Sequence, residues 1–374
     1  MALSWISVNA NDGSPIADLP GLLVGGALKR TIGRAEMQTA TLPLGPSQLP
    51  THGPNRGAIF RRAPKNWRQA TRKKAVFLVA LDEDSVPVWG GMVTERVTTH
   101  KSGVELSLAT AEDYFQDRYV GDETFYTYPQ NDLVKYLVEK YAATNGIPIR
   151  VQLLPGPNPV RGRAYLDRDD KTLGSVLEEL SGVQGGPEWT VGWEWVTTDR
   201  LGLVLYVGAR IGAAAPADLY PAARFYLPGS VQDAKLVDSY KRGEGANDVM
   251  ATSSGSGDAR PQSTRHTNAG DLRPRVEFRW SPSSSITNQD TLEDHAARAL
   301  AGMKDGTVAL AIVATRSKAP RLGTVWDMGD DVGFDLTGPA WPDGLTGTAR
   351  VLGIEITPTT VVPILDVTGI EGTE

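Results

Sequence analysis

The sequence has no cysteine among its 374 residues. This absence excludes disulfide bonds, thiolate metal sites and cysteine nucleophiles, although it does not assign a compartment. Long apolar runs are missing too, since no window approaches the roughly 20 apolar residues of a membrane-spanning helix. The N-terminus has neither the basic segment nor the apolar core of a signal peptide. We therefore expect no stable membrane insertion and no secretory leader.

Histidine is scarce, and no H-x-x-x-H pair occurs, so a histidine-based metal site is not expected. Nucleophile-elbow and phosphate-loop motifs are absent as well. The G-x-G sequence at 243–245 precedes a strand rather than a helix, which is the wrong geometry for a phosphate-binding turn. We expect no cofactor. The four histidines lie far apart, mostly in loop-like sequence: His52, His100, His266 and His295.

The carboxylates also give no catalytic pattern. Glu188 and Glu194 share a strand face, but six residues place them roughly 20 Å apart. Glycoside hydrolysis needs carboxyl groups about 5–9.5 Å apart. The one tight acidic cluster, Asp167, Asp169 and Asp170, precedes a helix, and a favourable interaction with the helix N-terminus explains it. A calcium site needs more oxygen ligands than this cluster supplies. The sequence therefore predicts a protein that is not an enzyme.

The overall composition is that of a folded protein, with 40% apolar and 22% charged residues. Forty glycines and 25 prolines favour many short strands joined by turns. The length suggests about two or three domains. A formal net charge of −6 argues against general or sequence-specific nucleic-acid binding.

The strongest pattern lies at 165–207 and predicts a helix followed by a β-hairpin. Thr172 or Asp170 can cap the start of the helix, and Gly182 can end it. Apolar residues recur at helical spacing and then alternate along a strand, so the two elements can bury each other in a two-layer α/β unit. The residues expected in this core are Leu173, Leu177, Leu180, Trp189, Trp193 and Trp195.

Three tryptophans on one strand face have a second interpretation as a sugar-stacking platform. Because the neighbouring helix needs an apolar partner and aromatic rings bury large areas, we favour the core.

The rest of the chain is mostly strand-like. Short strands at 75–81, 86–98 and 104–109 follow one another without an intervening helix, which is typical of an antiparallel sandwich or barrel. Helices are predicted at 132–143 and 292–303, where apolar residues recur at helical spacing. Further strands are predicted at 308–315, 332–336, 349–358 and 361–370.

The segment 61–74 is basic and contains no acidic residue. It has two interpretations, as a solvated loop or strand edge, or as a docking surface for an acidic partner. We hypothesise that it contacts a neighbouring subunit, with the acidic sequences at 82–84 or 327–331 as counterparts. The subunit-interface candidates are Arg61, Arg62, Lys65, Arg68, Arg72, Lys73 and Lys74.

Several short motifs occur in an order that resembles the order in a known family. They are VWGGMV at 88–93, EDYFQDRY at 112–119, TLGSVL at 172–177 with GPEW at 186–189, GANDVMA at 245–251, and VWDMGDDV at 325–332. Together they resemble the bacteriophage tail hub or minor tail proteins, the baseplate-hub-like family of actinobacterial siphophages.

This resemblance implies an α+β, mainly β fold, in which two tube-like antiparallel β-barrels carry α/β insertion domains. Three copies form a ring with pseudo-sixfold symmetry in this family. The first barrel corresponds to 1–118 and the second to 225–252 with 306–374. An α/β insertion domain corresponds to 119–224, and a loop and helix insertion to 253–305.

The resemblance further implies a structural virion protein at the tail tip, assembled in the host cytoplasm. It would connect the tail tube to host-recognition components during host cell entry. Its expected partners are further copies of itself, as a trimer, the distal tail or tail tube protein, the tape measure protein, and tip or fibre proteins. Two alternatives stay open: a tail-associated hydrolase of cell wall or capsule, and a carbohydrate-binding tail module.

Overall fold

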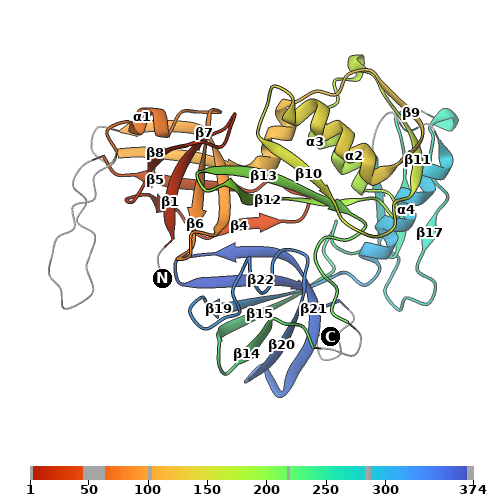
Figure 1. Cartoon of the computed structure of the whole chain (residues 1–374). Coiled ribbons are helices and arrows are strands. Elements are labelled where there is room, and N and C mark those ends of the chain that lie inside the picture. The colour runs from red at the N-terminus through yellow and green to blue at the C-terminus, as the bar shows by residue number, and fades with distance from the viewer. Residues whose placement is uncertain are drawn as a thin grey trace.

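Two seven-stranded sheets form the frame of the molecule (Figure 1). The computed structural model describes residues 3–44, 64–99, 103–216, 220–255, 257–282, 286 and 288–368. The first sheet comes from the N-terminal part of the chain, and the second comes mainly from the C-terminal part. An α/β unit lies beside the first sheet, and a smaller unit with one long helix follows it in the sequence. The chain is therefore mainly β with few helices, as expected.

The first sheet is antiparallel and has the strand order β2-β1-β6-β7-β8-β5-β3. The predicted strands at 75–81, 86–98 and 104–109 are confirmed as β6, β7 and β8. Every residue of β6 is buried, because apolar layers cover both faces of the sheet there. The strands are β1 (Ser4–Asn9), β2 (Pro15–Asp18), β3 (Leu23–Val24), β5 (Met37–Leu42), β6 (Val76–Leu81), β7 (Pro87–Thr99) and β8 (Gly103–Thr110).

The second sheet has the order β14-β20-β21-β22-β19-β15, and the four strands predicted from 308 onward all belong to it. Strand β14 runs parallel to β20, whereas the other neighbours are antiparallel. The strands are β14 (Arg224–Leu227), β15 (Val231–Ser239), β19 (Thr307–Thr315), β20 (Asp331–Gly338), β21 (Trp341–Ile356) and β22 (Thr360–Asp366).

A short strand from the N-terminal part joins the two sheets. Strand β4 (Leu28–Thr31) lies between β3 and β5 of the first sheet in the sequence, but it pairs with β21 of the second sheet. Arg30 therefore lies opposite Ile354. The largest apolar cluster accordingly contains residues of both sheets, including Trp89 of the first and Phe334 of the second. The two sheets thus share one core. Neither sheet closes on itself by strand pairing within the described ranges, so the two expected barrels are not confirmed.

The α/β unit contains a three-stranded sheet, a two-stranded ribbon and two main helices. Parallel pairing joins β10 to β13, and antiparallel pairing joins β13 to β12. Helix α2 continues through a π-helical turn at Glu139–Ala143, which matches the predicted helix at 132–143. The elements are β9 (Glu123–Pro129), α2 (Gln130–Val138), β10 (Ile149–Leu153), β11 (Val160–Tyr165), α3 (Leu173–Ser181), β12 (Glu188–Thr197) and β13 (Arg200–Gly208).

Helix α3 and its hairpin are confirmed. The Ser175 amide donates to the Thr172 hydroxyl at 3.1 Å, so Thr172 is the N-cap. Asp170, the alternative cap, lies two residues before Thr172 and has a left-handed backbone with φ +48°. Gly182 ends the helix, and its amide donates to the carbonyl of Glu178.

The small unit differs from the domain boundaries that we expected. Strand β16, at the end of the stretch 225–252, does not join the second sheet but pairs with β17 and β18. Helix α4 packs on this three-stranded sheet through an apolar cluster of its own, which includes Val249 and Leu292. The helix confirms the one predicted at 292–303 and begins three residues earlier. The elements are β16 (Asp248–Ala251), β17 (His266–Thr267), β18 (Glu277–Trp280) and α4 (Gln289–Met303).

The α/β unit packs on the face of the first sheet that points away from the second. Their shared apolar cluster includes Phe77 and Met92 of the first sheet and Leu177 and Val191 of the α/β unit, but no residue of the second sheet. Contact between the α/β unit and the second sheet is therefore made by other means. No helix in the described ranges is long and apolar enough to cross a bilayer.

Candidate functional site

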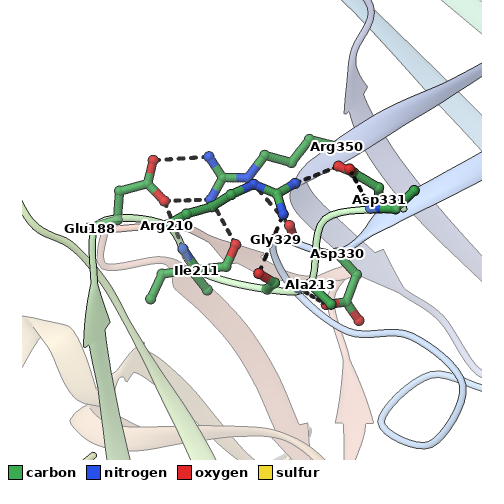
Figure 2. A network of polar contacts seen from close by, with 10 residues as sticks. Glu188, Arg210, Ile211, Ala213, Gly329, Asp330, Asp331 and Arg350 are labelled. Carbon is green, nitrogen blue, oxygen red and sulfur yellow. Dashed lines mark hydrogen bonds and ion pairs between the residues drawn. The ribbon is translucent and has the colours of Figure 1, made fainter. Parts of the chain in front are cut away.

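Charged side chains join the α/β unit to the second sheet (Figure 2). Glu188 begins β12, and Arg350 lies in β21; the two form a bidentate ion pair, with 2.9 Å between Nη1 and Oε1. The Ile211 amide donates to the same carboxylate at 2.9 Å, and its carbonyl accepts from Arg350 at 2.9 Å. Burial alone raises the pKa of Glu188, but the bonds from Arg350 and Ile211 outweigh it and lower the pKa. Glu188 therefore stays charged and holds the junction.

The same junction ties the linker after β13 to the second sheet. Arg210 pairs with Asp331, and the Ala213 amide donates to Asp330 at 2.7 Å. Gly212 and Gly329 both have positive φ, and their backbones touch: a Cβ on Gly212 would lie 2.0 Å from the Gly329 carbonyl carbon. Only glycine allows this approach. The segment that follows β13 is thus anchored at its start.

A buried carboxyl group links the first sheet to β12, and the sequence analysis missed it. Glu112 lies in the 3-10 turn Ala111–Asp117 and is only 8% exposed. The Val191 amide donates to it at 3.3 Å. Burial raises the pKa of Glu112. The alternation of residues around 112 gives no sign of burial, because a 3-10 turn has neither helical nor strand spacing.

The tryptophans of β12 do not form one surface. Trp189 is 4% exposed, and Trp193 lies edge-on to Phe77 with 5.1 Å between the ring centroids. A Cβ on Gly90 would lie 2.4 Å from the Trp193 ring, so glycine there lets the indole lie against β7. Trp195 is 38% exposed, and its Nε1 donates to the Ser85 carbonyl at 2.8 Å. The prediction that Trp195 belongs to the core is wrong, because β12 runs past the apolar layer that covers Trp189. The three residues of helix α3 that were predicted to lie in this core, Leu173, Leu177 and Leu180, are all buried.

The basic side chains in the described part of the basic segment are exposed, and this part is partly helical. A short helix, α1 (Trp67–Ala70), begins within it, and the Arg68 guanidinium stacks on the Trp67 ring at 4.6 Å. Lys74 differs from the others, since it pairs with Asp113 at 3.2 Å and with Asp117. Lys74 therefore fastens the first sheet to its own closing turn. Arg61 and Arg62 lie outside the described residues, whereas the following basic side chains are exposed: Lys65, Arg68, Arg72, Lys73 and Lys74.

Most of the acidic counterparts that we expected on a neighbouring subunit are paired within the chain. Arg321 binds both Asp82, at 2.7 Å, and Asp84. Asp327 pairs with Arg30 at 3.0 Å. These residues therefore already have cationic partners within the chain, and their role as counterparts at 82–84 and 327–331 stays a prediction. Glu83 remains exposed.

The other acidic residues that the sequence analysis considered are either paired or exposed. Glu194 pairs with Arg150, with 2.7 Å between Oε2 and Nη2. Asp167, Asp169 and Asp170 are exposed. Within the described ranges, no group of three or more His, Asp or Glu side chains could hold a metal ion.

Helix α4 fastens the small unit to the α/β unit. His295 of this helix is fully buried, and its Nδ1 donates to the Gly182 carbonyl at 3.0 Å. Burial lowers the pKa of His295. Asp294, next to it, pairs with Arg161 of β11. His52 and His100 lie outside the described residues.

On its other side, α4 holds β17 through Glu293. This carboxylate accepts from the Thr264 amide at 2.6 Å, and 2.7 Å separates its Oε2 from His266 Nε2. Partial burial raises the pKa of Glu293, but these hydrogen bonds outweigh it and lower the pKa to about 2. A carboxyl group with a lowered pKa stabilises the fold above its unfolded pKa, and the contribution is lost as the pH falls through the folded value.

We therefore predict that Glu293→Gln lowers the free energy of unfolding by about 1–2 kcal/mol at pH 7. The difference from wild type should shrink as the pH falls from about 4.5 to 2, because the wild-type carboxylate becomes protonated. Urea denaturation at pH 7, 5 and 3 checks this. A difference that stays constant over this range would contradict the assigned role of Glu293.

No family model matches the sequence, and no similar protein was found among curated sequences. Among solved structures, the fold is similar to a tail protein from Neisseria meningitidis MC58, with a TM-score of 0.56 and 13% identity over 99% of this chain and 97% of that one. The 43 kDa tail protein of prophage MuSo2 from Shewanella oneidensis gives 0.55 and 12%, over 97% and 98%.

Prophage tail protein gp18 from Listeria monocytogenes EGD-e gives a TM-score of 0.51 and 10% identity, over 99% of this chain and 95% of that one. At these identities the comparisons establish a shared fold. The similarity extends over nearly the full length of all three proteins.

Proposed function

We propose that this chain is a structural protein of a bacteriophage tail and forms the hub at its distal end. The observation that carries the proposal is the full-length match in fold to three tail proteins, two of which come from prophages. A chain that shared only one domain with tail proteins would match them over only part of its length. Several ion pairs of the described residues join one unit to another, which fits a scaffold.

In this proposal, the two large sheets are curved walls of a tube rather than barrels closed within one chain. The first wall comprises 1–118, and the second comprises 225–247 with 306–374, once β16 is assigned to the insertion. Three copies would then supply six similar walls to one ring. The units at 119–224 and 248–305 would face outward, where other tail proteins can reach them. The shared core of the two sheets holds their relative angle fixed.

The proposed partners are those of a tail tip. Within the ring they are two further copies of this chain. Above and below it are the tail tube or distal tail protein, the tape measure protein, and tip or fibre proteins. The site of action is the virion, after assembly in the host cytoplasm.

The exposed basic segment is the proposed contact between subunits. In a closed ring, one patch of each subunit meets a different patch of the next subunit. Arg68, Arg72 and Lys73 are exposed and make no ion pair within the described part of the chain. Charges of this kind affect assembly rate and register more than affinity.

We expect a variant with Arg68, Arg72 and Lys73 changed to Glu to lose ring assembly while its monomer stays folded. Lys74 is left unchanged because it pairs within the chain. Mass photometry at low and high salt measures assembly, and circular dichroism measures folding. A matched control changes three exposed arginines elsewhere, Arg168, Arg200 and Arg242, to Glu.

The control variant has the same change in net charge but leaves the basic segment intact. It should therefore assemble like wild type. If the Arg68, Arg72 and Lys73 variant also assembles like wild type at every salt concentration, the segment is a solvated loop. If wild type stays monomeric throughout, the ring itself is wrong.

A further inference from the structure

A cleft of about 470 Å³ opens beside the charged junction. The floor is the face of the sheet β10-β13-β12 that carries Thr190 and Tyr206. The linker after β13 forms one wall, and the loop before β20 forms another. Most of its lining is apolar. The side chains that supply the apolar surface are Leu154, Pro155, Ile211 and Met328.

One positively charged group lines this cleft with donors to spare. Arg30 of β4 donates from Nη1 to Asp327 at 3.0 Å, and its side chain is 15% exposed. Its Nε and Nη2 make no hydrogen bond within the described ranges, and neither is among the buried unsatisfied atoms. These two N–H groups form the side-on edge of a guanidinium, which matches the two oxygens of a carboxylate. The free edge of Arg30 is therefore suited to a carboxylate.

A hydroxyl group lines the same cleft. Tyr206 of β13 projects from the floor, and its Oη has no hydrogen-bond partner in the part of the chain that the structure describes. Thr190 of β12 lies beside it in the lining. An apolar cleft with a few convergent polar groups at a junction between units is the usual form of a ligand site.

The acidic residues of the lining do not oppose an anion strongly. Asp327 is paired with Arg30 and also accepts from the Met328 amide at 2.7 Å. Asp330 accepts from the amides of Ala213 and Asp327 at 2.7 and 2.8 Å. Arg210, the second arginine of the lining, is paired with Asp331. Both acidic residues of the lining therefore have donors of their own, and Arg30 keeps two free N–H groups.

We propose that this cleft binds an organic acid, with its carboxylate on the free edge of Arg30 and its compact apolar body against Leu154 and Pro155. The hydroxyl of Tyr206 donates a further hydrogen bond to the carboxylate. The acid can be a free molecule or the carboxylate at the end of a peptide chain, since both present the same group. The binding site is separate from the basic segment and does not depend on ring assembly.

Isothermal titration with 4-phenylbutyrate and its neutral amide tests the site. The acid should bind at least about tenfold more tightly, because charge-assisted hydrogen bonds are about twice as strong as neutral ones. The peptide Gly-Gly-Phe with a free or an amidated C-terminus tests the second source. The proposal requires the preference for the acid in at least one of these two pairs.

Arg30→Gln should abolish the preference for the acid, and Tyr206→Phe should weaken binding of the acid several-fold. Lys29→Gln is the matched control: it removes the same charge from the adjacent position of β4, where Lys29 pairs with Glu355 instead. Leu154→Trp should fill the cleft and abolish binding of both members of each pair, since Leu154 lines the cleft and is only partly buried. Thermal denaturation of each variant shows that the fold survives.

Equal binding of acid and amide in both pairs would overturn the proposal. So would an acid preference that persists in the Arg30→Gln variant, or an absence of binding by folded wild type at millimolar concentrations of every probe.

Discussion

Replacing Trp189 by alanine is expected to destabilise the chain by about 3–5 kcal/mol, the usual cost of deleting a buried tryptophan. The indole is 4% exposed and lies edge-on to Phe115, with 5.8 Å between the ring centroids. It belongs to the apolar cluster that holds the α/β unit on the first sheet. Urea denaturation followed by circular dichroism measures the loss.

Trp195→Ala is the matched control, because it removes the same side chain from the same strand. Trp195 is 38% exposed and makes one hydrogen bond, to Ser85, so its loss should cost only about 1 kcal/mol. Equal effects of the two substitutions would contradict the packing described for β12. A folded Trp189→Ala variant of unchanged stability that had lost binding to host glycans would support the sugar-stacking interpretation.

Replacing Arg350 by alanine is expected to cost about 3 kcal/mol, the lower end of the range for breaking a buried ion pair. The side chains of Arg350 and Glu188 are each only 20% exposed, so the substitution leaves Glu188 partly buried without its charged partner. The Ile211 carbonyl also loses a donor. Because charge rather than apolar packing joins the α/β unit to the second sheet, the two should separate more readily in this variant.

Arg150→Ala is the control for this substitution. Arg150 and Glu194 form an ion pair in the same α/β unit, but their side chains are 50% and 31% exposed. An exposed pair of this kind contributes about 0–1 kcal/mol. Urea denaturation of both variants gives the comparison. Similar losses for the two variants would mean that the junction adds no more than a surface ion pair.

Local sequence patterns predicted those helices and strands whose formation depends on residues close together in the sequence. Helix α3 was predicted because its apolar stripe and its Thr172 cap lie within a few residues of each other. The strands of the two large sheets were predicted because alternation and turn residues are local as well. The resemblance of short motifs added the expectation of a tail protein fold, which the structural comparisons support.

Long-range pairing could not be predicted in this way. Strand β4 pairs with β21, more than 300 residues later, and nothing in the sequence around Arg30 indicates that partner. Alternation places Trp195 on the same face as Trp189, but it does not show how far the covering layer extends. His295 lies in the predicted helix at 292–303, but the apolar pattern of that helix does not show that the imidazole is buried against Gly182. The cleft lined by Arg30 and Tyr206 depends on the same long-range pairing.

The central claim is that this chain is a structural component at the distal end of a phage tail. Electron microscopy of purified virions, labelled with gold-conjugated antibodies against this chain, tests it most directly. We predict gold particles at the tip of the tail on most virions and none on the capsid. Labelling of the capsid, or unlabelled virions with the protein left behind in the lysate, would contradict the claim.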